Sequence, residues 1–342
     1  ADDNYEALLQ FFIKFPDLVS NDFYVTGESY GGVYVPTLTR RILMGNQAGT
    51  GTTINLKGFA VGNGLSSDSL NTDSSMWFAY HHGIIGESLW NSLMANCCTS
   101  PYTRQTCPFS ASKNSECQAD VQKVMDVIYG GQLNWYNIYG DCLQTTADGA
   151  PKEPRFSYQK YVHELSFLHR WYHELNDYKY IKQMQQAYGE NVPCLDTTGA
   201  DIYLNRADVK SALHISSKVT ANWSICSSSL QYTDLYKDLT PVYRDIFALD
   251  SSVYATVYNG DTDLSCNFLM DQWFVDDLNM TATDTWHEWY YDDSAGPQVA
   301  GWTKDFEKIA FVTVRGSGHM VPQYKPVPAL KMFEYFLQHK SL

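Results

Sequence analysis

Three residues of this sequence have the types that nucleophilic acyl chemistry requires. Ser29 lies in the G-x-S-x-G pattern of residues 27–31, Asp261 lies in N-G-D, and His319 lies in G-S-G-H-M. A serine hydroxyl is a poor nucleophile until a base removes its proton. A neutral imidazole is such a base, and a carboxylate fixes the imidazole tautomer. The three residues therefore predict a Ser-Asp-His catalytic triad.

Each of these residues follows a short apolar run that predicts a buried strand. The runs are Phe23–Val25, Val253–Tyr258 and Ile309–Val314. In parallel α/β sheets, functional groups collect at the carboxyl ends of the strands. The chain order Ser, Asp, His is that of α/β-hydrolases, in which the serine occupies a strained turn between a strand and a helix. Taken singly, Asp261 and His319 would be ordinary turn and loop residues.

Further apolar patterns complete an α/β arrangement. A helix at Val33–Met44 and a strand at Leu56–Val61 follow Ser29, and this strand-helix-strand unit predicts a parallel sheet. An N-terminal helix is expected to end at Pro16. The other expected helices are Ser88–Met94, Asp120–Ile128, Arg206–Leu213, Leu230–Phe247, Phe268–Leu278 and Pro328–His339.

Residues 65–194 differ in character from the flanking segments, 1–64 and 195–342. They are rich in Tyr, Trp, His, Asn and Cys, so we predict an inserted helical cap between two parts of an α/β core. Six of the eight cysteines lie here, without the paired spacing of a zinc site. This usage favours disulfides and an oxidising compartment. Sequons at Asn222 and Asn279 agree with passage through the secretory pathway.

Composition excludes some function classes. Hydrophobic residues make up 44% of the 342 residues, enough for a packed core, and the net charge of −14 argues against a nucleic-acid partner. We find no apolar run of membrane-spanning length and no signal peptide. His163, His169 and His173 have near-helical spacing, but without an HExxH pattern we favour surface or packing roles. No metal and no cofactor are expected.

Four segments resemble the serine carboxypeptidases. They are GESYGGVYVP, GFAVGNGLSS, YNGDTDLSCNF and GSGHMVPQYKP, and the resemblance extends through the cysteine-rich insertion that begins ANCCTS. It implies an α/β-hydrolase fold with an inserted, disulfide-stapled helical cap. It also implies hydrolysis of the C-terminal peptide bond of peptides and proteins through an acyl-enzyme, in a lysosomal or secreted protein.

The resemblance implies roles for individual residues. Ser29, Asp261 and His319 match the family triad, and the Tyr30 N–H matches one oxyanion donor. Glu28 matches the glutamate that binds the C-terminal carboxylate of the substrate. Two carboxylates can share such a contact only if one holds a proton. A raised pKa at a buried Glu28 therefore predicts activity that is favoured at acidic pH.

Other matches lie in the cap and near the histidine. Tyr136 matches a substrate-side tyrosine of the cap, Met320 matches a residue beside the leaving-group pocket, and Cys266 matches a thiol near the aspartate. The family's disulfides imply the pairs Cys97–Cys117, Cys98–Cys107 and Cys142–Cys194. In the family, a region ahead of this chain's first residue supplies a second oxyanion N–H and a partner for Cys226. We therefore expect the chain to lack the N-terminal third of the enzyme.

Two alternatives stay open. The same residues would serve acyl transfer, in which an alcohol takes the acyl group instead of water. The resemblance also allows a non-catalytic, protective subunit that stabilises lysosomal glycosidases, and it allows a homodimer. A fluorophosphonate probe separates these classes, because a subunit that only binds needs no activated Ser29.

Overall fold

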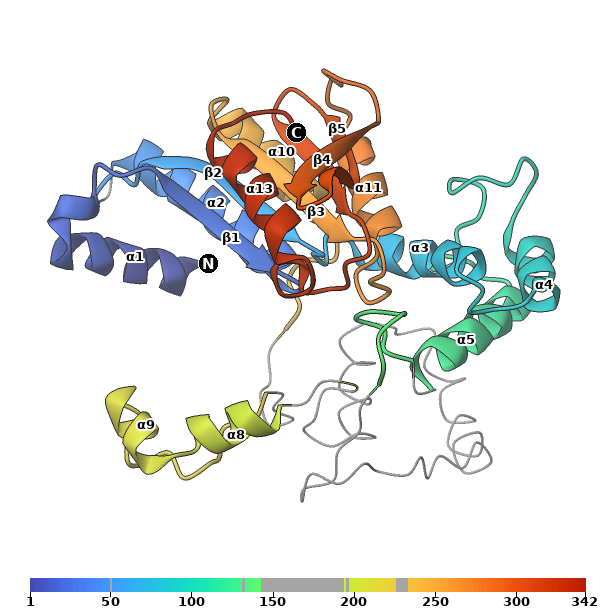
Figure 1. Ribbon diagram of the computed structural model, residues 1–342, viewed down its shortest axis with the longest axis horizontal. Coiled ribbons are helices and arrows are strands. Elements are labelled where there is room, and N and C mark those ends of the chain that lie inside the picture. The colour runs from blue at the N-terminus through green and yellow to red at the C-terminus, as the bar shows by residue number, and fades with distance from the viewer. Residues whose placement is uncertain (50, 131–132, 143–193, 195–196, 226–232) are drawn as a thin grey trace. The chain divides into compact units, whose positions relative to one another are not determined.

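The computed structural model describes residues 1–49, 51–130, 133–142, 194, 197–225 and 233–342 (Figure 1). The chain divides into two compact units. The first comprises Ala1–Ile128, Trp135–Ile138 and Tyr236–Leu342, and the second comprises Tyr129–Asn134 and Tyr139–Leu235. Residues 65–128 thus belong to the first unit, and the predicted cap boundaries at 65 and 194 stay a prediction.

A six-stranded mixed sheet forms the centre of the first unit, with the order β1-β2-β3-β6-β5-β4 (Figure 1). The strands are β1 Phe23–Glu28, β2 Leu56–Gly62, β3 Tyr254–Gly260, β4 His287–Asp293, β5 Gly296–Asp305 and β6 Ile309–Val314. Strands β1, β2, β3 and β6 pair in parallel, and β5 and β4 are added antiparallel. Gly62 is in register with both Glu28 and Tyr258, so β1 and β2 end at one level and β3 continues past it to Gly260.

The four predicted strands are confirmed as β1, β2, β3 and β6. The sequence reasoning missed the hairpin of β4 and β5. Strand β4, HEWYYDD, is polar at both ends and buries only Trp289 fully, so it lacks the apolar run that marks a buried strand. Trp289 anchors this edge strand by donating its indole N–H to the Thr313 carbonyl at 2.9 Å.

The first unit also contains helices, some of which pack on the sheet. They are α1 Asp2–Lys14, the short 3-10 helix η1 Pro16–Leu18, α2 Gly31–Ala48, α3 Asp68–His81, α4 Glu87–Cys97, α5 Ser115–Tyr129, α10 Thr240–Leu249, α11 Phe268–Asp277, α12 Val321–Tyr324 and α13 Pro326–Leu337. Helix α3 was not predicted, because its Ser, Asn, Thr and Asp residues are weak helix formers. The predicted helix from Leu230 was wrong in extent: α10 begins at Thr240, with Pro241 in its first turn.

The core lies on both faces of the sheet. On one face, side chains of α1, α2, α10 and α11 pack on β2 and β3, and Phe59, Tyr243 and Phe274 are fully buried there. On the other face, Met332 and Ala329 of α13 pack against Val312 of β6. Burying a large apolar side chain contributes roughly 1.5–3 kcal/mol. The sheet therefore supplies a rigid platform for the loops that leave its carboxyl edge.

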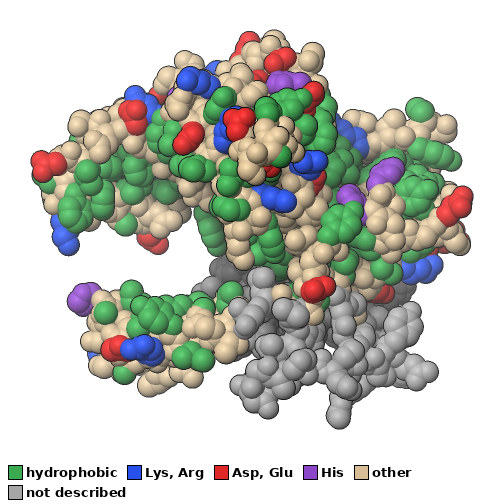
Figure 2. Space-filling view, viewed as in Figure 1, with side chains coloured by type: hydrophobic (Ala, Val, Ile, Leu, Met, Phe, Trp, Pro, Cys, Tyr) green, Lys and Arg blue, Asp and Glu red, His purple; other side chains and the backbone are tan. Residues whose placement is uncertain are grey.

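Strand β1 forms one edge of this sheet, and α1 packs beside it through a contact between Phe12 and Phe23, whose ring centroids are 5.8 Å apart. The outer face of α1 is apolar. The exposed fraction is 64% for Ile13, 40% for Phe11 and 43% for Phe15. Figure 2 shows hydrophobic side chains on the surface over α1.

The second unit is described only in part. It contains helices α8 Thr198–Leu204 and α9 Ala207–Ala212, and the latter lies within the predicted helix Arg206–Leu213. Asn205 links these helices to the segment that follows, because its side chain exchanges two hydrogen bonds of 2.8 Å with the backbone of Trp223.

Candidate active site

Ser29 occupies a sharp turn between β1 and α2. Its φ angle is 63°, in the left-handed region that is costly for residues other than glycine. The turn is fixed by its neighbours: the Ser29 N–H donates to the Gly62 carbonyl at 3.0 Å, and Leu65 N–H donates to the Ser29 carbonyl at 2.9 Å. The predicted strained turn between a strand and a helix is therefore present.

Glycines permit this turn by close packing. A Cβ atom on Gly27 would lie 2.8 Å from Val35 Cγ2, and one on Gly32 would lie 2.5 Å from the Leu65 nitrogen. Gly31, the second glycine of the motif, has much more room. Of these three positions, Gly32 thus has the least room for a side chain, and it lies one residue beyond the G-x-S-x-G pattern.

His319 and Asp263 form a buried pair. His319 follows β6 and Asp263 follows β3, and the two strands are neighbours in the sheet. The imidazole Nδ1 lies 2.7 Å from Asp263 Oδ2, and the residues are 3% and 0% exposed. When Nδ1–H donates to a carboxylate, Nε2 is left as the proton acceptor, which is the tautomer that a general base needs.

The prediction that Asp261 is the carboxylate partner of the histidine is wrong. Asp261 continues directly from β3, and its Oδ1 accepts a hydrogen bond from the Gly316 N–H at 2.6 Å. The chain then turns, with Thr262 N–H donating to the Ser317 carbonyl at 2.9 Å. This turn brings the second aspartate of N-G-D-T-D, Asp263, against the imidazole.

Ser29 and the His319–Asp263 pair lie at the same carboxyl edge of the sheet. Among the described residues, Ser29 Oγ forms no hydrogen bond with the imidazole. Serine–base contacts are often long in unliganded sites and tighten when substrate binds. The structure shows the left-handed turn at Ser29 and the buried His319–Asp263 pair, each after the end of a parallel strand.

Electrostatics couple Glu28 to this pair. Burial raises the pKa of Glu28, His319 lowers it and Asp263 raises it again, with a net rise. Burial lowers the pKa of His319, but the carboxylates of Asp263 and, more weakly, Glu28 more than offset this, so that it too is raised. Burial and the Glu28 charge together also raise the pKa of Tyr258, which lies on β3, on the far side of β2 from Glu28.

Three other predicted site residues lie around the histidine and the serine turn. The Tyr136 carbonyl accepts the His319 backbone N–H at 2.7 Å, and the two ring centroids are 4.8 Å apart. Met320 follows His319 at the start of α12, and Tyr30 precedes the first residue of α2. Their roles toward substrate and oxyanion stay predictions.

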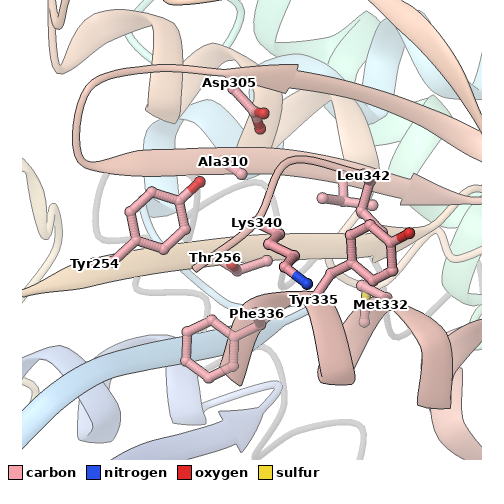
Figure 3. A pocket seen from close by; sticks show the side chains of 10 residues that line it. Tyr254, Thr256, Asp305, Ala310, Met332, Tyr335, Phe336, Lys340 and Leu342 are labelled. Atoms are coloured by element: carbon pink, nitrogen blue, oxygen red, sulfur yellow. The ribbon is translucent and has the colours of Figure 1, made fainter. Parts of the chain in front are cut away.

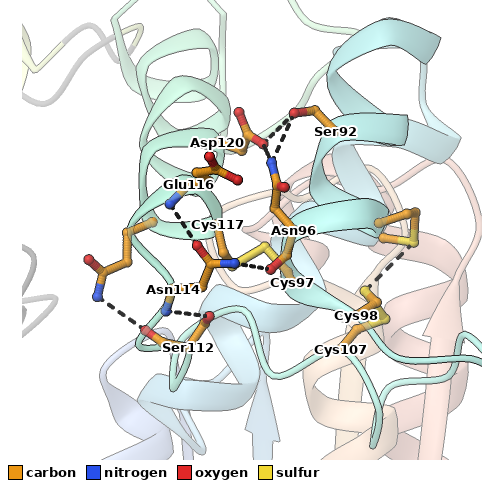
Figure 4. The surroundings of a disulfide bond; sticks show 12 residues. Ser92, Asn96, Cys97, Cys98, Cys107, Ser112, Asn114, Glu116, Cys117 and Asp120 are labelled. Carbon is orange, nitrogen blue, oxygen red and sulfur yellow. Dashed lines mark hydrogen bonds between the residues drawn. A yellow bond between two sulfur atoms is a disulfide. The ribbon is translucent and has the colours of Figure 1, made fainter.

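The cysteine pairs implied by the resemblance are confirmed. They are Cys97–Cys117, Cys98–Cys107 and Cys142–Cys194. Figure 4 shows that the first links α4 to α5, beside a polar cluster in which Asn96 and Ser92 donate to Asp120. Cys266 is a buried thiol.

Other predicted positions are exposed or lie outside the described residues. Asn222 and Asn279 are exposed, and their glycosylation stays a prediction. The residues that lie outside the described part of the chain are Cys226, His163, His169 and His173.

In the part of the chain that the structure describes, no group of three or more His, Cys, Asp or Glu side chains is arranged to hold a metal ion. A small pocket, open to solvent, is lined by Tyr254, Thr256 and Asp305, together with residues of α13 and the C-terminal segment (Figure 3). These residues lie at the starting end of β3, opposite the edge that bears Asp263, so the pocket is not part of the candidate active site.

The comparisons with known proteins agree with this architecture. A sheet of this order, with a serine on a strand-to-helix turn and a histidine–aspartate pair at the same edge, defines an α/β-hydrolase fold. The crystal structure of Kex1Δp, a prohormone-processing carboxypeptidase from Saccharomyces cerevisiae, is similar, with a TM-score of 0.61 and 18% sequence identity. The match covers 97% of this chain and 65% of that chain.

A family model described as serine carboxypeptidase, peptidase S10, matches residues 1–339. The chain belongs to the serine carboxypeptidase family. It is 37% identical to the lysosomal protective protein of Mus musculus over 98% of this chain and 69% of that protein. It is also 33% identical to serine carboxypeptidase ctsa-4.1 of Caenorhabditis elegans, over 99% of this chain and 68% of that protein.

Sequence reasoning missed Asn63 at this site. Its side-chain Nδ2 donates to Asp263 Oδ2 at 2.9 Å, and the residue is fully buried. The only signal in the sequence was the Gly-Asn-Gly turn after the Leu56–Val61 strand, which any strand end could have.

Proposed function

We propose that this protein hydrolyses the C-terminal peptide bond of peptides and proteins through an acyl-enzyme, with Ser29 as nucleophile, His319 as general base and Asp263 as its carboxylate partner. The observation that supports this most directly is the buried His319–Asp263 pair at the sheet edge where Ser29 occupies a left-handed turn. Family membership supports the same reaction.

The chemistry follows from the hydrogen bonds. His319 Nδ1–H donates to Asp263, so Nε2 takes the Ser29 Oγ proton as the oxygen attacks the peptide carbonyl carbon. The imidazolium then gives this proton to the leaving amine, and the released amino acid departs. Water, deprotonated in turn by Nε2, attacks the ester and frees Ser29.

The oxyanion of each tetrahedral intermediate needs hydrogen-bond donors. The Tyr30 N–H, which directly follows the nucleophile at the start of α2, is the donor that we assign. The N-terminal end of this 18-residue helix adds a favourable dipole. A single donor of this kind typically lowers the barrier by about 2.7–4 kcal/mol.

Glu28 gives the site its preference for a chain end. It directly precedes the nucleophile, and its raised pKa favours a neutral carboxyl that donates a hydrogen bond to the substrate's terminal carboxylate. An internal peptide bond offers no such carboxylate. Activity on C-terminal bonds at acidic pH follows from this pairing.

The test is hydrolysis of a blocked dipeptide with a free C-terminal carboxylate by the full-length protein at pH 5 and pH 7.5, with Ser29→Ala as the control. We expect faster release of the C-terminal amino acid at pH 5 and labelling of Ser29, but not of the variant, by a fluorophosphonate. A folded protein that neither cleaves the dipeptide nor reacts with the probe would exclude the proposal and favour a protective, non-catalytic role.

The cellular setting follows from the relatives and the disulfides. One relative is named a lysosomal protein, and three disulfides suit an oxidising compartment. We infer a lysosomal or secreted location. No helix in the described part of the chain has the length and apolar character needed to cross a bilayer.

A further inference from the structure

Asn63 bridges the ends of two neighbouring strands beneath the catalytic carboxylate. It directly follows β2, it is 0% exposed, and its φ of 40° lies in the left-handed region that asparagine tolerates better than most residues. Its backbone N–H donates to the Tyr258 carbonyl at 2.8 Å, and its Oδ1 accepts the Gly260 N–H at 2.9 Å. The side chain is therefore held at both ends of its amide.

The donor end of that amide points to the triad. Asn63 Nδ2 lies 2.9 Å from Asp263 Oδ2, the same oxygen that receives the His319 Nδ1–H. Backbone N–H groups complete the environment: Cys266 donates to Oδ2 at 3.2 Å and Ser265 donates to Oδ1 at 2.9 Å. All of these partners are donors, which matches an acceptor-only carboxylate.

We propose that Asn63 is a positioning residue for the reaction, because it fixes the Asp263 carboxylate and through it the orientation and tautomer of His319. This inference rests on the proposed function. The backbone donors belong to the turn that contains Asp263 itself. Asn63 is the side chain that ties the carboxylate to a different strand, β2, and so to the serine turn that Gly62 supports.

The decisive variant is Asn63→Asp, which keeps the shape and the acceptor for Gly260 but replaces the donor by an ionisable oxygen. When that new carboxyl is ionised, it repels Asp263 and adds negative charge near His319, so the imidazole stays protonated to higher pH. The acid limb of the kcat/KM profile is expected to move upward by roughly one to two pH units. The Asp263 charge also acts on Glu28, Asp271 and Tyr324, and the variant replaces none of these residues.

Asn259→Asp is the matched control. Asn259 is equally buried, and its Nδ2 donates at 2.9 Å to the carboxylate of Asp271, one strand away from the Asn63 site. The same isosteric change is made there, next to a carboxylate that does not contact His319. We expect the acid limb of this variant to shift much less than that of Asn63→Asp, because Asp271 interacts with the Asp263 charge but does not contact His319, so the larger shift in Asn63→Asp reports positioning and not general damage.

Two further measurements test the proposal even if the Asn63→Asp variant does not fold. Asn63→Ser removes the contact with Asp263 and is expected to lower kcat by about 10²-fold with little change in KM. In the wild-type protein, NMR of selectively labelled asparagine is expected to show the Asn63 side-chain amide titrating with the same midpoint as His319. An Asn63→Asp profile that coincides with that of the wild type, full kcat in Asn63→Ser, or an amide signal that does not follow His319 would each overturn the inference.

These outcomes are separable from failure of the proposed function. A wild-type protein that neither cleaves the dipeptide nor reacts at Ser29 would exclude the carboxypeptidase reaction. The NMR titration would still decide whether Asn63 is coupled to the His319–Asp263 pair.

Discussion

His319 Nδ1 lies 2.7 Å from Asp263 Oδ2, whereas Asp261, two residues earlier in the chain, accepts a hydrogen bond from the Gly316 N–H. The two carboxylates of one five-residue turn therefore have different tasks. Asp263 orients the imidazole, and Asp261 holds together the loops that follow β3 and β6. Mutation to asparagine can separate these tasks, because an amide can replace the Asp261 carboxylate as an acceptor but cannot replace the Asp263 carboxylate beside the imidazole.

Asp263→Asn is expected to lower kcat by about 10⁴-fold, because an amide that donates to Nδ1 selects the wrong imidazole tautomer. Asp261→Asn keeps an oxygen that accepts the Gly316 N–H, so we expect its kcat to fall by less than about tenfold. Steady-state hydrolysis of the blocked dipeptide by both variants checks this assignment. Equal losses in the two variants, or the larger loss in Asp261→Asn, would contradict it.

Glu28→Gln tests the pH dependence. The folded pKa of Glu28 is raised, so the protonated form that binds a substrate carboxylate is lost as the pH rises through that raised value. Glutamine donates the same hydrogen bond at every pH. We expect the alkaline fall of kcat/KM to disappear in the variant, whereas a substrate with a blocked C-terminus, used as the control, behaves alike in both proteins. Persistence of the alkaline fall in Glu28→Gln would show that another group causes it.

Glu28 and His319 also titrate as a pair. Each charge shifts the pKa of the other, so the midpoints of the kcat/KM profile belong to the two groups together. The productive form has the proton on Glu28 and a neutral imidazole. A bell-shaped profile is expected, with an acid limb that survives in Glu28→Gln and does not move downward, because the protonated Glu28 of the productive form is as neutral as the amide.

Much of the fold was predictable because its signals are local. Buried parallel strands read as apolar runs, and Pro16 ends the first helix as expected. The edge strand β4 buries only Trp289 fully, and α3 is made of weak helix formers, so tertiary packing decides both elements. Neither element has a pattern that a single sequence can reveal.

The candidate site was predictable in type but not in every residue. The G-x-S-x-G pattern predicted Ser29, because the packing beside the turn excludes a side chain at Gly27, a requirement that lies close to Ser29 in the sequence. In N-G-D-T-D, both aspartates follow the same strand. Which of them contacts His319 depends on the turn at Thr262, whose N–H donates to the Ser317 carbonyl about 55 residues later in the chain. Asn63 acts through a contact with a residue 200 positions away, which no local pattern encodes.

Asp271 is expected to make folding stability depend on pH. It is fully buried, and burial raises its pKa to about 7, although Ser66 and Asn259 donate hydrogen bonds to its carboxylate. When the pKa of a carboxyl is higher in the folded protein than in the unfolded chain, its protonation stabilises the fold. This contribution is complete below the unfolded pKa of about 3.9. This contribution is lost as the pH rises through about 7. The fold should therefore be more stable in acid than at neutral pH.

Asp271→Asn removes this proton linkage. The asparagine can accept from Asn259 and donate to Ser66 Oγ, so these two hydrogen bonds survive without a charge. Wild-type free energy of unfolding is expected to fall by a few kcal/mol between pH 5 and pH 8, and that fall should be smaller in the variant. Urea unfolding at the two pH values measures it, with the exposed Asp292→Asn on β4 as the control. A pH dependence equal to that of the wild type would remove Asp271 as its source.

The Cys97–Cys117 disulfide should be the main covalent support of the α4–α5 pair. It closes a loop of 20 residues, and the chain-entropy estimate for a loop of this size is about 3 kcal/mol. The double variant Cys97→Ala/Cys117→Ala is therefore expected to unfold at lower urea concentration while keeping kcat, because the sheet positions the catalytic residues. Ser92→Ala, which removes the hydrogen bond to Asp120 and the one that Ser92 Oγ accepts from Asn96 but no covalent link, should cost about 1 kcal/mol. If the double variant proved as stable as Ser92→Ala, packing of α4 against α5, and not the disulfide, would be the dominant support.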